Sequence, residues 1–296
     1  MFGECHAHLF MNGINYRRAV EDHKCGADIG IIRRYLQAYR EAGVTFIRDG
    51  GDRYGVSEQA KKLAGEYGID YRTPVFAIHW QGHYGGIVGK SVSSFTEYRE
   101  CIKEVRAHGG DFVKIMVSGI MEYSGYGVLS ELALEKERIC EMIHIAHEEG
   151  FPVMVHANGT EAVLPAVIAG AESIEHGNYI SRECMEAMAD MGCVWVPTAV
   201  TTKNLIGCGR YTDEILKQIF TMECENIAYA YACGVQMAAG SDAGAYMVPH
   251  GTGVLQEAEI FQDILGKNGA DECLKKGEDC IKARFKKGPG NGKYLQ

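Results

Sequence analysis

Short apolar segments rich in β-branched residues alternate with longer amphipathic segments along almost the whole chain. The short segments are predicted strands, at residues 2–9, 44–51, 69–78, 111–119, 152–159, 171–177, 193–198 and 234–242. The longer segments are predicted helices, near residues 28–42, 56–67, 94–108, 131–149, 160–169, 181–191, 212–232 and 254–266. Several helices are followed by a glycine, such as Gly43, Gly68 and Gly150, which can close the helix in the left-handed conformation. This alternation predicts parallel strands covered by helices.

The number of strand–helix repeats reduces the number of possible folds. Eight strands, each followed by a helix, are typical of a (β/α)8 TIM barrel, and a chain of 296 residues is long enough for one as a single domain. An open doubly wound sheet is the alternative, but no GxGxxG motif follows an early strand. We therefore predict an α/β barrel over residues 1–266, then a C-terminal helix and a flexible tail over residues 267–296.

Composition excludes several classes of partner. The formal net charge of −9 argues against nucleic acid and anionic membrane surfaces, so a small-molecule substrate is expected. The eleven cysteines form no CxxC pair, which is typical of free thiols in a reducing compartment. The chain shows neither a signal peptide nor a run of about 18 apolar residues. A cytoplasmic location is the expectation.

Polar residues gather at one end of the predicted strands. His6 and His8 are two residues apart in the first strand, so both side chains point to the same face. Other polar residues stand at or near the C-terminal ends of later strands, where barrel enzymes place their reacting groups: Lys114, His156, His176 and Asp242. Burying these groups without a metal would leave large desolvation costs unmet. The pattern predicts a site for divalent metal ions.

Lys114 requires a separate interpretation, because an ammonium group repels a cation. It is either an ordinary lysine paired with Asp242 or a buried amine with a lowered pKa. Such an amine is nucleophilic and can react with carbon dioxide. The product is a carbamate whose two oxygens can bridge two metal ions.

These motifs together resemble the amidohydrolase superfamily, in its prolidase-like and imidazolonepropionase-like branch. The resemblance covers residues 2 to about 265 and rests on six motifs: HxH at residues 6–8, DFVKIMVSG, VMVHANG, SIEHG, VPT, and GSDAG followed by His250-Gly251-Thr252. It implies a binuclear centre, usually of zinc, that is bridged by a carboxylated lysine and a hydroxide. One metal would be bound by His6, His8 and Asp242, the other by His156 and His176, and Lys114 would bridge both.

The resemblance also implies a reaction. A metal-bridging hydroxide would cleave an amide C–N bond in a dipeptide, an N-acyl amino acid or a cyclic amide, and Asp242 would carry the proton to the leaving group. Many members of this branch have a small β-sandwich that is not evident here, so either this lineage is barrel-only or the sequence is cut down. The barrel surface that a sandwich would cover makes a homo-oligomer plausible.

Loops after the strands are expected to bind the substrate. The glycine-rich loop 79–90 contains His79 and His83, loop 118–130 contains Tyr126, and the last loop contributes His250. We predict that these four residues contact the substrate; each is equally explained as a hydrated residue at the rim.

Three alternatives remain open. A mononuclear aminohydrolase (deaminase) would be expected to have a glutamate shortly after His156 and no lysine at position 114, whereas Ala157, Asn158 and Gly159 follow here. An ester, lactone or organophosphate hydrolase would use the same site. Outside enzymes, a non-catalytic barrel scaffold would be expected to have lost ligands. Imidazole and carboxylate ligands also leave the metal open between zinc, manganese and iron.

Overall fold

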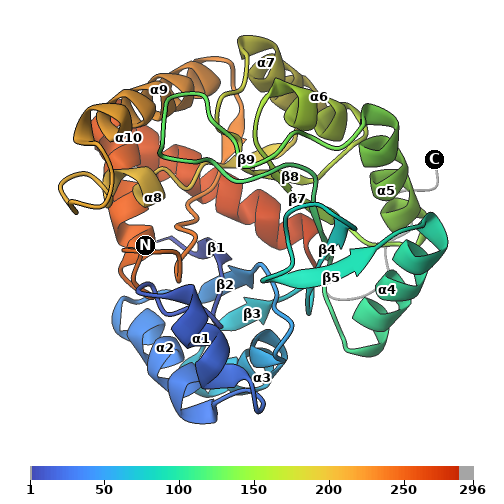
Figure 1. The fold of residues 1–296 in the computed structure, drawn as a ribbon. Coiled ribbons are helices and arrows are strands. Elements are labelled where there is room, and N and C mark those ends of the chain that lie inside the picture. The colour runs from blue at the N-terminus through green and yellow to red at the C-terminus, as the bar shows by residue number, and fades with distance from the viewer. Residues whose placement is uncertain (1, 287–296) are drawn as a thin grey trace.

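The computed structural model describes residues 2–286, and its strands occupy the centre with helices around them (Figure 1). The strands are β1 (Glu4–Ala7), β2 (Phe46–Asp49), β3 (Asp70–Arg72), β4 (Ala77–Trp80), β5 (Gly89–Val92), β6 (Val113–Met116), β7 (Val153–Ala157), β8 (Ser173–His176), β9 (Val194–Val196) and β10 (Gln236–Met237). Each of the eight predicted strand segments contains at least one of them.

The helices follow the predicted order. They are α1 (Tyr16–His23), α2 (Ile29–Glu41), α3 (Val56–Leu63), α4 (Phe95–Ala107), α5 (Lys136–Glu148), α6 (Thr160–Ile168), α7 (Arg182–Met191), α8 (Val200–Lys203), α9 (Asp213–Ala232) and α10 (Gly253–Arg284). A 3₁₀ turn, Ala64–Tyr67, extends α3. The helices α1 and α8 were not predicted; both lie in loops that follow strands.

All strand pairs are parallel, in two sheets. One sheet has the order β1-β2-β3, and the other has the order β10-β9-β8-β7-β6-β4-β5. The chain after β10 lies along β1, where the amide of Asp242 donates to the His6 carbonyl at 2.8 Å and the amide of His8 donates to Ala243 at 2.9 Å. The structure thus confirms an α/β fold with parallel strands.

The third predicted strand differs from expectation. Residues 69–78 form two strands, β3 and β4, separated by a turn at which Val75 has a positive φ of 71°. The amide of Asp111 donates to the Thr73 carbonyl in this turn at 2.8 Å. An additional strand, β5, forms from part of the glycine-rich segment that was predicted to be a loop.

The C-terminal part of the last helix lies near the N-terminal ends of the strands. In Figure 1 the C-terminal part of α10 passes behind them, and Gly266, with φ 73° and ψ 155°, breaks the helix at the predicted boundary. Phe285 packs with residues at or near the strand starts, among them Phe112 and Met154. The predicted tail lies mostly in residues 287–296, outside the described residues. No helix within residues 2–286 is long and apolar enough to cross a membrane.

Candidate metal centre

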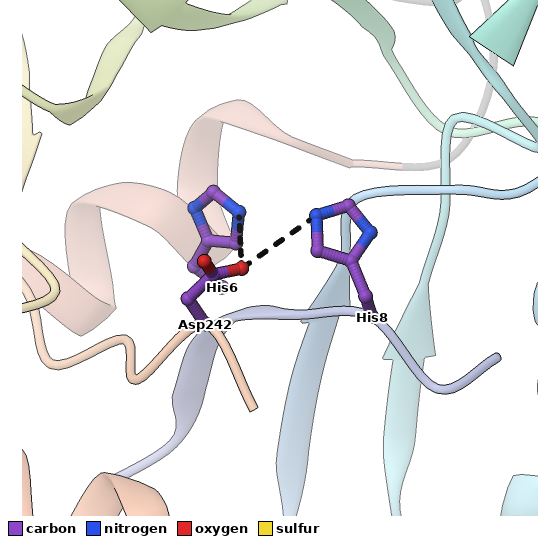
Figure 2. A group of neighbouring side chains, drawn as sticks. All are labelled: His6, His8 and Asp242. Carbon is purple, nitrogen blue, oxygen red and sulfur yellow. Dashed lines mark ion pairs between the residues drawn. The ribbon is translucent and has the colours of Figure 1, made fainter. Parts of the chain in front are cut away.

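Three side chains from opposite ends of the sequence meet at the carboxyl end of β1. Figure 2 shows His6, His8 and Asp242 pointing toward one another. Asp242 Oδ1 lies 3.5 Å from His6 Nε2 and 3.7 Å from His8 Nε2. One atom from each residue can be chosen so that all three lie within 4.8 Å of one another. The sequence-predicted group is therefore brought together in space.

The spacing of this group fits a shared cation better than direct contacts. Distances of 3.5 and 3.7 Å are longer than ordinary hydrogen bonds. Two atoms that each bind one tetrahedral zinc ion at 2.0–2.1 Å are separated by roughly 3.4 Å. His6 Nε2 is buried and has no hydrogen-bond partner within the described part of the chain. A divalent metal would satisfy this atom.

His156 and His176 continue the cluster from β7 and β8. Ring centres are 4.9 Å apart between His6 and His176, and 4.7 Å apart between His176 and His156. Burial lowers the pKa of all four imidazoles, to about 3 for His8 and His156. At neutral pH the rings are uncharged, which is the form of histidine that binds metals.

Lys114 on β6 lies in the same pocket as Asp242 and the imidazoles, and its side chain is buried. Burial lowers the pKa of its amine to about 8. Within the described residues no carboxylate lies within 4.0 Å of this amine, so the alternative of a direct Lys114–Asp242 ion pair finds no support in the geometry. Burial likewise raises the pKa of Asp242, to about 7.

Two predicted ligands have unusual backbones. His176 has φ 67° and Asp242 has φ 57°, in the left-handed region that side chains other than glycine rarely adopt. A residue held there costs on the order of 1 kcal/mol or more, and such residues cluster at functional sites. The fold maintains strain at two positions that aim side chains into the site.

Hydrogen bonds behind the imidazoles fix their orientation. Glu175 accepts from His6 Nδ1 at 2.7 Å and from the Arg48 guanidinium at 2.8 Å, and all three side chains are fully buried. His176 Nδ1 is 2.8 Å from the Thr198 hydroxyl. A carboxylate behind a histidine fixes the ring tautomer and makes the opposite nitrogen a better ligand. The second nitrogen of His6 is thereby directed at Asp242.

Sequence reasoning missed Glu175 and two other supporting residues. Glu4 accepts from the amide of Ser241 at 2.8 Å and holds the turn before Asp242, and burial raises its pKa to about 8. The amide group of Asn158 donates to the Gly119 carbonyl and accepts from the backbone of Asn178, each at 3.0 Å. One signal was available for the two glutamates, because charged residues are unusual inside otherwise apolar strands.

The His8 ring occupies space that is available only because residue 50 is a glycine. A Cβ atom at position 50 would lie 2.3 Å from His8 Cε1, well inside van der Waals contact. A side chain there would push the imidazole away from Asp242.

A sequence model of the amidohydrolase family matches residues 4–276. The chain belongs to the amidohydrolase family. This confirms the resemblance inferred from the motifs at the strand ends. The two metal ions and the role of each ligand remain predictions.

Curated relatives of this amidohydrolase match only in part. An uncharacterized protein of Mycobacterium tuberculosis is 29% identical over 128 residues, which cover 41% of this chain and 34% of that protein. Ochratoxinase of Aspergillus niger is 23% identical over 189 residues, which cover 62% of this chain and 38% of that protein. The matched stretch thus spans little more than a third of these relatives.

Solved structures share the fold across nearly the whole amidohydrolase chain. A Xaa-Pro dipeptidase with bound methionine in its active site has a TM-score of 0.75 at 20% identity, covering 99% of this chain and 78% of that one. The A. niger ochratoxinase structure has a TM-score of 0.75 at 16% identity, covering 96% and 71%. At these identities the likeness concerns the fold.

A pocket of about 320 Å³ adjoins the candidate metal centre of this amidohydrolase, and its volume is at the lower end of the range for small-molecule sites. His8, Lys114, His156, His176 and Asp242 line it. Its other walls are mostly apolar and aromatic, and include Met11, Tyr16, Tyr84, Met116, Met121, Tyr123, Leu205, Tyr211 and Tyr246. The pocket therefore joins the candidate metal centre to a largely apolar cavity.

None of the four residues predicted to contact substrate lines this pocket. The His79 ring hydrogen-bonds the Trp80 carbonyl at 3.1 Å, and His83 Nδ1 faces the Glu131 carboxylate at 3.4 Å. Tyr126 is exposed, and its ring lies 5.3 Å from that of Tyr179. His250 is engaged by the Tyr39 hydroxyl and the Met11 carbonyl.

Tyr84, next to His83, occupies the pocket wall instead. Its ring centre lies 5.4 Å from that of His156. Burial raises the pKa of its hydroxyl, and the nearby Asp242 carboxylate adds to this effect.

Proposed function

We propose that this chain is a metal-dependent hydrolase that cleaves an amide C–N bond in a small substrate such as a dipeptide, an N-acyl amino acid or a cyclic amide. Family membership and the convergence of neutral imidazoles, Asp242 and Lys114 on one pocket support the proposal. The observation that carries it is the buried Nε2 of His6, which is directed at Asp242 and has no hydrogen-bond partner among residues 2–286. The proposed scaffold is a closed (β/α)8 barrel, with the two sheets joined between β1 and residues 239–243.

Six residues would hold two divalent metal ions, which we propose to be zinc. His6, His8 and Asp242 would bind one ion, His156 and His176 the other, and Lys114 would reach both as a carbamate formed from its amine and carbon dioxide with loss of one proton. When bound, such ions lower the pKa of water and polarise a substrate carbonyl.

Side chains of the protein would carry out proton transfer, hold the ligands in place and exclude water. Asp242 would accept a proton from the attacking water and return it to the leaving nitrogen. Glu175 would keep the His6 ring fixed during turnover, and the apolar walls would exclude bulk water from the carbonyl.

A screen with the zinc-loaded protein tests the bond that is cut. We expect release of amino acid from members of Xaa-Pro, Xaa-Arg or N-acyl amino acid libraries, measured by mass spectrometry. Lys114→Ala should lose at least about 100-fold in kcat/KM, because both ions lose a shared ligand. Ammonia release from aminated rings, turnover of esters and lactones alone, or undiminished activity of Lys114→Ala would contradict the proposal.

A further inference from the structure

Arg210 does not itself line the pocket, but its guanidinium lies against two tyrosines that do. Arg210 is exposed and lies between α8 and α9. Its guanidinium carbon is 5.2 Å from the ring centre of Tyr211 and 4.8 Å from that of Tyr246. Both tyrosines line the pocket, and they come from two different loops. The two stacking contacts therefore hold the guanidinium at the rim.

No carboxylate neutralises Arg210 within residues 2–286. Other arginines, such as Arg33, Arg99 and Arg138, have a glutamate within ion-pair distance. Within the described residues the guanidinium of Arg210 makes no hydrogen bond, so its N–H groups are available to a ligand. The edge of a guanidinium matches the two oxygens of a carboxylate.

The cavity below Arg210 has the opposite character. Met11, Met116, Met121 and Leu205 give it apolar walls, and its charged groups, Lys114 and Asp242, belong to the proposed metal centre. A carboxylate placed against the apolar walls would lose its hydration without compensation. The carboxylate of a substrate is therefore better placed at the rim than against the apolar walls, with the apolar part of the substrate inside.

We infer that Arg210 binds the carboxylate of the substrate and thereby selects N-acyl amino acids with a large apolar group over neutral amides. This inference rests on the proposed function, which it narrows, because cyclic amides without a carboxylate gain nothing from Arg210. The residue determines specificity and takes no part in bond cleavage.

Binding to the metal-free protein tests this inference apart from catalysis. The probes are N-benzoyl-leucine and N-benzoyl-phenylalanine, each as the acid and as the uncharged primary carboxamide, with Kd measured by calorimetry. The wild-type protein should bind at least one acid about 10-fold more tightly than its carboxamide. Arg210→Gln should bind both forms with Kd values within about 3-fold of each other, because the charge-assisted hydrogen bonds are gone.

Arg182→Gln is the matched control. Arg182 is an exposed arginine that stacks on Tyr229 at 4.7 Å, and neither residue lines the pocket. This variant should keep the wild-type preference for acids. Arg17 is another exposed arginine near the pocket, with its guanidinium carbon 5.8 Å from the ring centre of Tyr16, which lines the pocket. Equal binding of acid and carboxamide by the wild type, no binding of any probe, or a preference that survives Arg210→Gln but is lost in Arg17→Gln would overturn the inference. If the acids bind as expected but the metal-loaded protein cuts no C–N bond, the proposed function fails and the carboxylate site stands.

Discussion

Replacing Asp242 with asparagine is expected to lower kcat/KM for amide hydrolysis by about 10²–10⁴-fold, because in the proposed mechanism this residue carries the proton and is an anionic metal ligand. Asparagine is the right replacement, since it tolerates the left-handed backbone of Asp242, where φ is 57°. The fold should therefore survive. Steady-state kinetics on the best substrate of the screen, with circular dichroism for folding, measure both effects.

An exposed aspartate provides the control for this substitution. Asp190 lies on α7 and does not line the pocket, so Asp190→Asn should retain wild-type kinetics. A folded Asp242→Asn protein with kcat/KM within about 3-fold of the wild type would remove Asp242 from the mechanism.

Glu175→Ala is expected to have the largest effect on stability. Its carboxylate is buried and accepts from Arg48, His6 and Ser173. Without it, Arg48 remains charged and unpaired in the interior, which costs about 3–5 kcal/mol of the free energy of unfolding. Urea denaturation of the metal-free protein measures this cost without a contribution from bound ions.

Two further variants separate the buried charge from a general loss of packing. Glu148, an exposed partner of Arg99 at 2.6 Å, is the surface control, and Glu148→Ala should cost less than about 1 kcal/mol. The double variant Arg48→Met/Glu175→Leu removes both buried charges and should regain part of the lost stability. A Glu175→Ala protein as stable as Glu148→Ala would show that Arg48 does not depend on this partner.

Much of the fold and the predicted ligand set follow from local sequence patterns. Parallel strands that start a βα repeat point their last residues to one edge, so His156, His176 and Asp242 are expected to approach one another wherever the strands pair in register. The two-residue spacing of His6 and His8 adds a second constraint of the same kind. The ring distances of 4.7–5.4 Å along this cluster agree with that expectation.

The residues that support the predicted ligands, and those in the surrounding loops, could not be predicted in this way. Arg48 and Glu175 are far apart in sequence, and their pairing depends on both strands facing the same interior. The same limit applies to loop residues: in a glycine-rich loop the backbone is free to present either His83 or Tyr84, and tertiary contacts bring Tyr84 beside His156 while His83 faces Glu131. Arg210 had no motif of its own, and its place is defined by tyrosines from two separate loops.

A zinc titration of chelator-treated protein tests the central claim most directly, with bound metal and amide hydrolysis followed in the same samples. The account predicts no hydrolysis in the metal-free protein and an activity that rises with added zinc and saturates at two bound ions per chain. Lys114→Ala should bind fewer ions and show no such rise. Full hydrolysis by protein shown to contain no metal would contradict the account, and so would saturation at one bound ion with Lys114→Ala as active as the wild type.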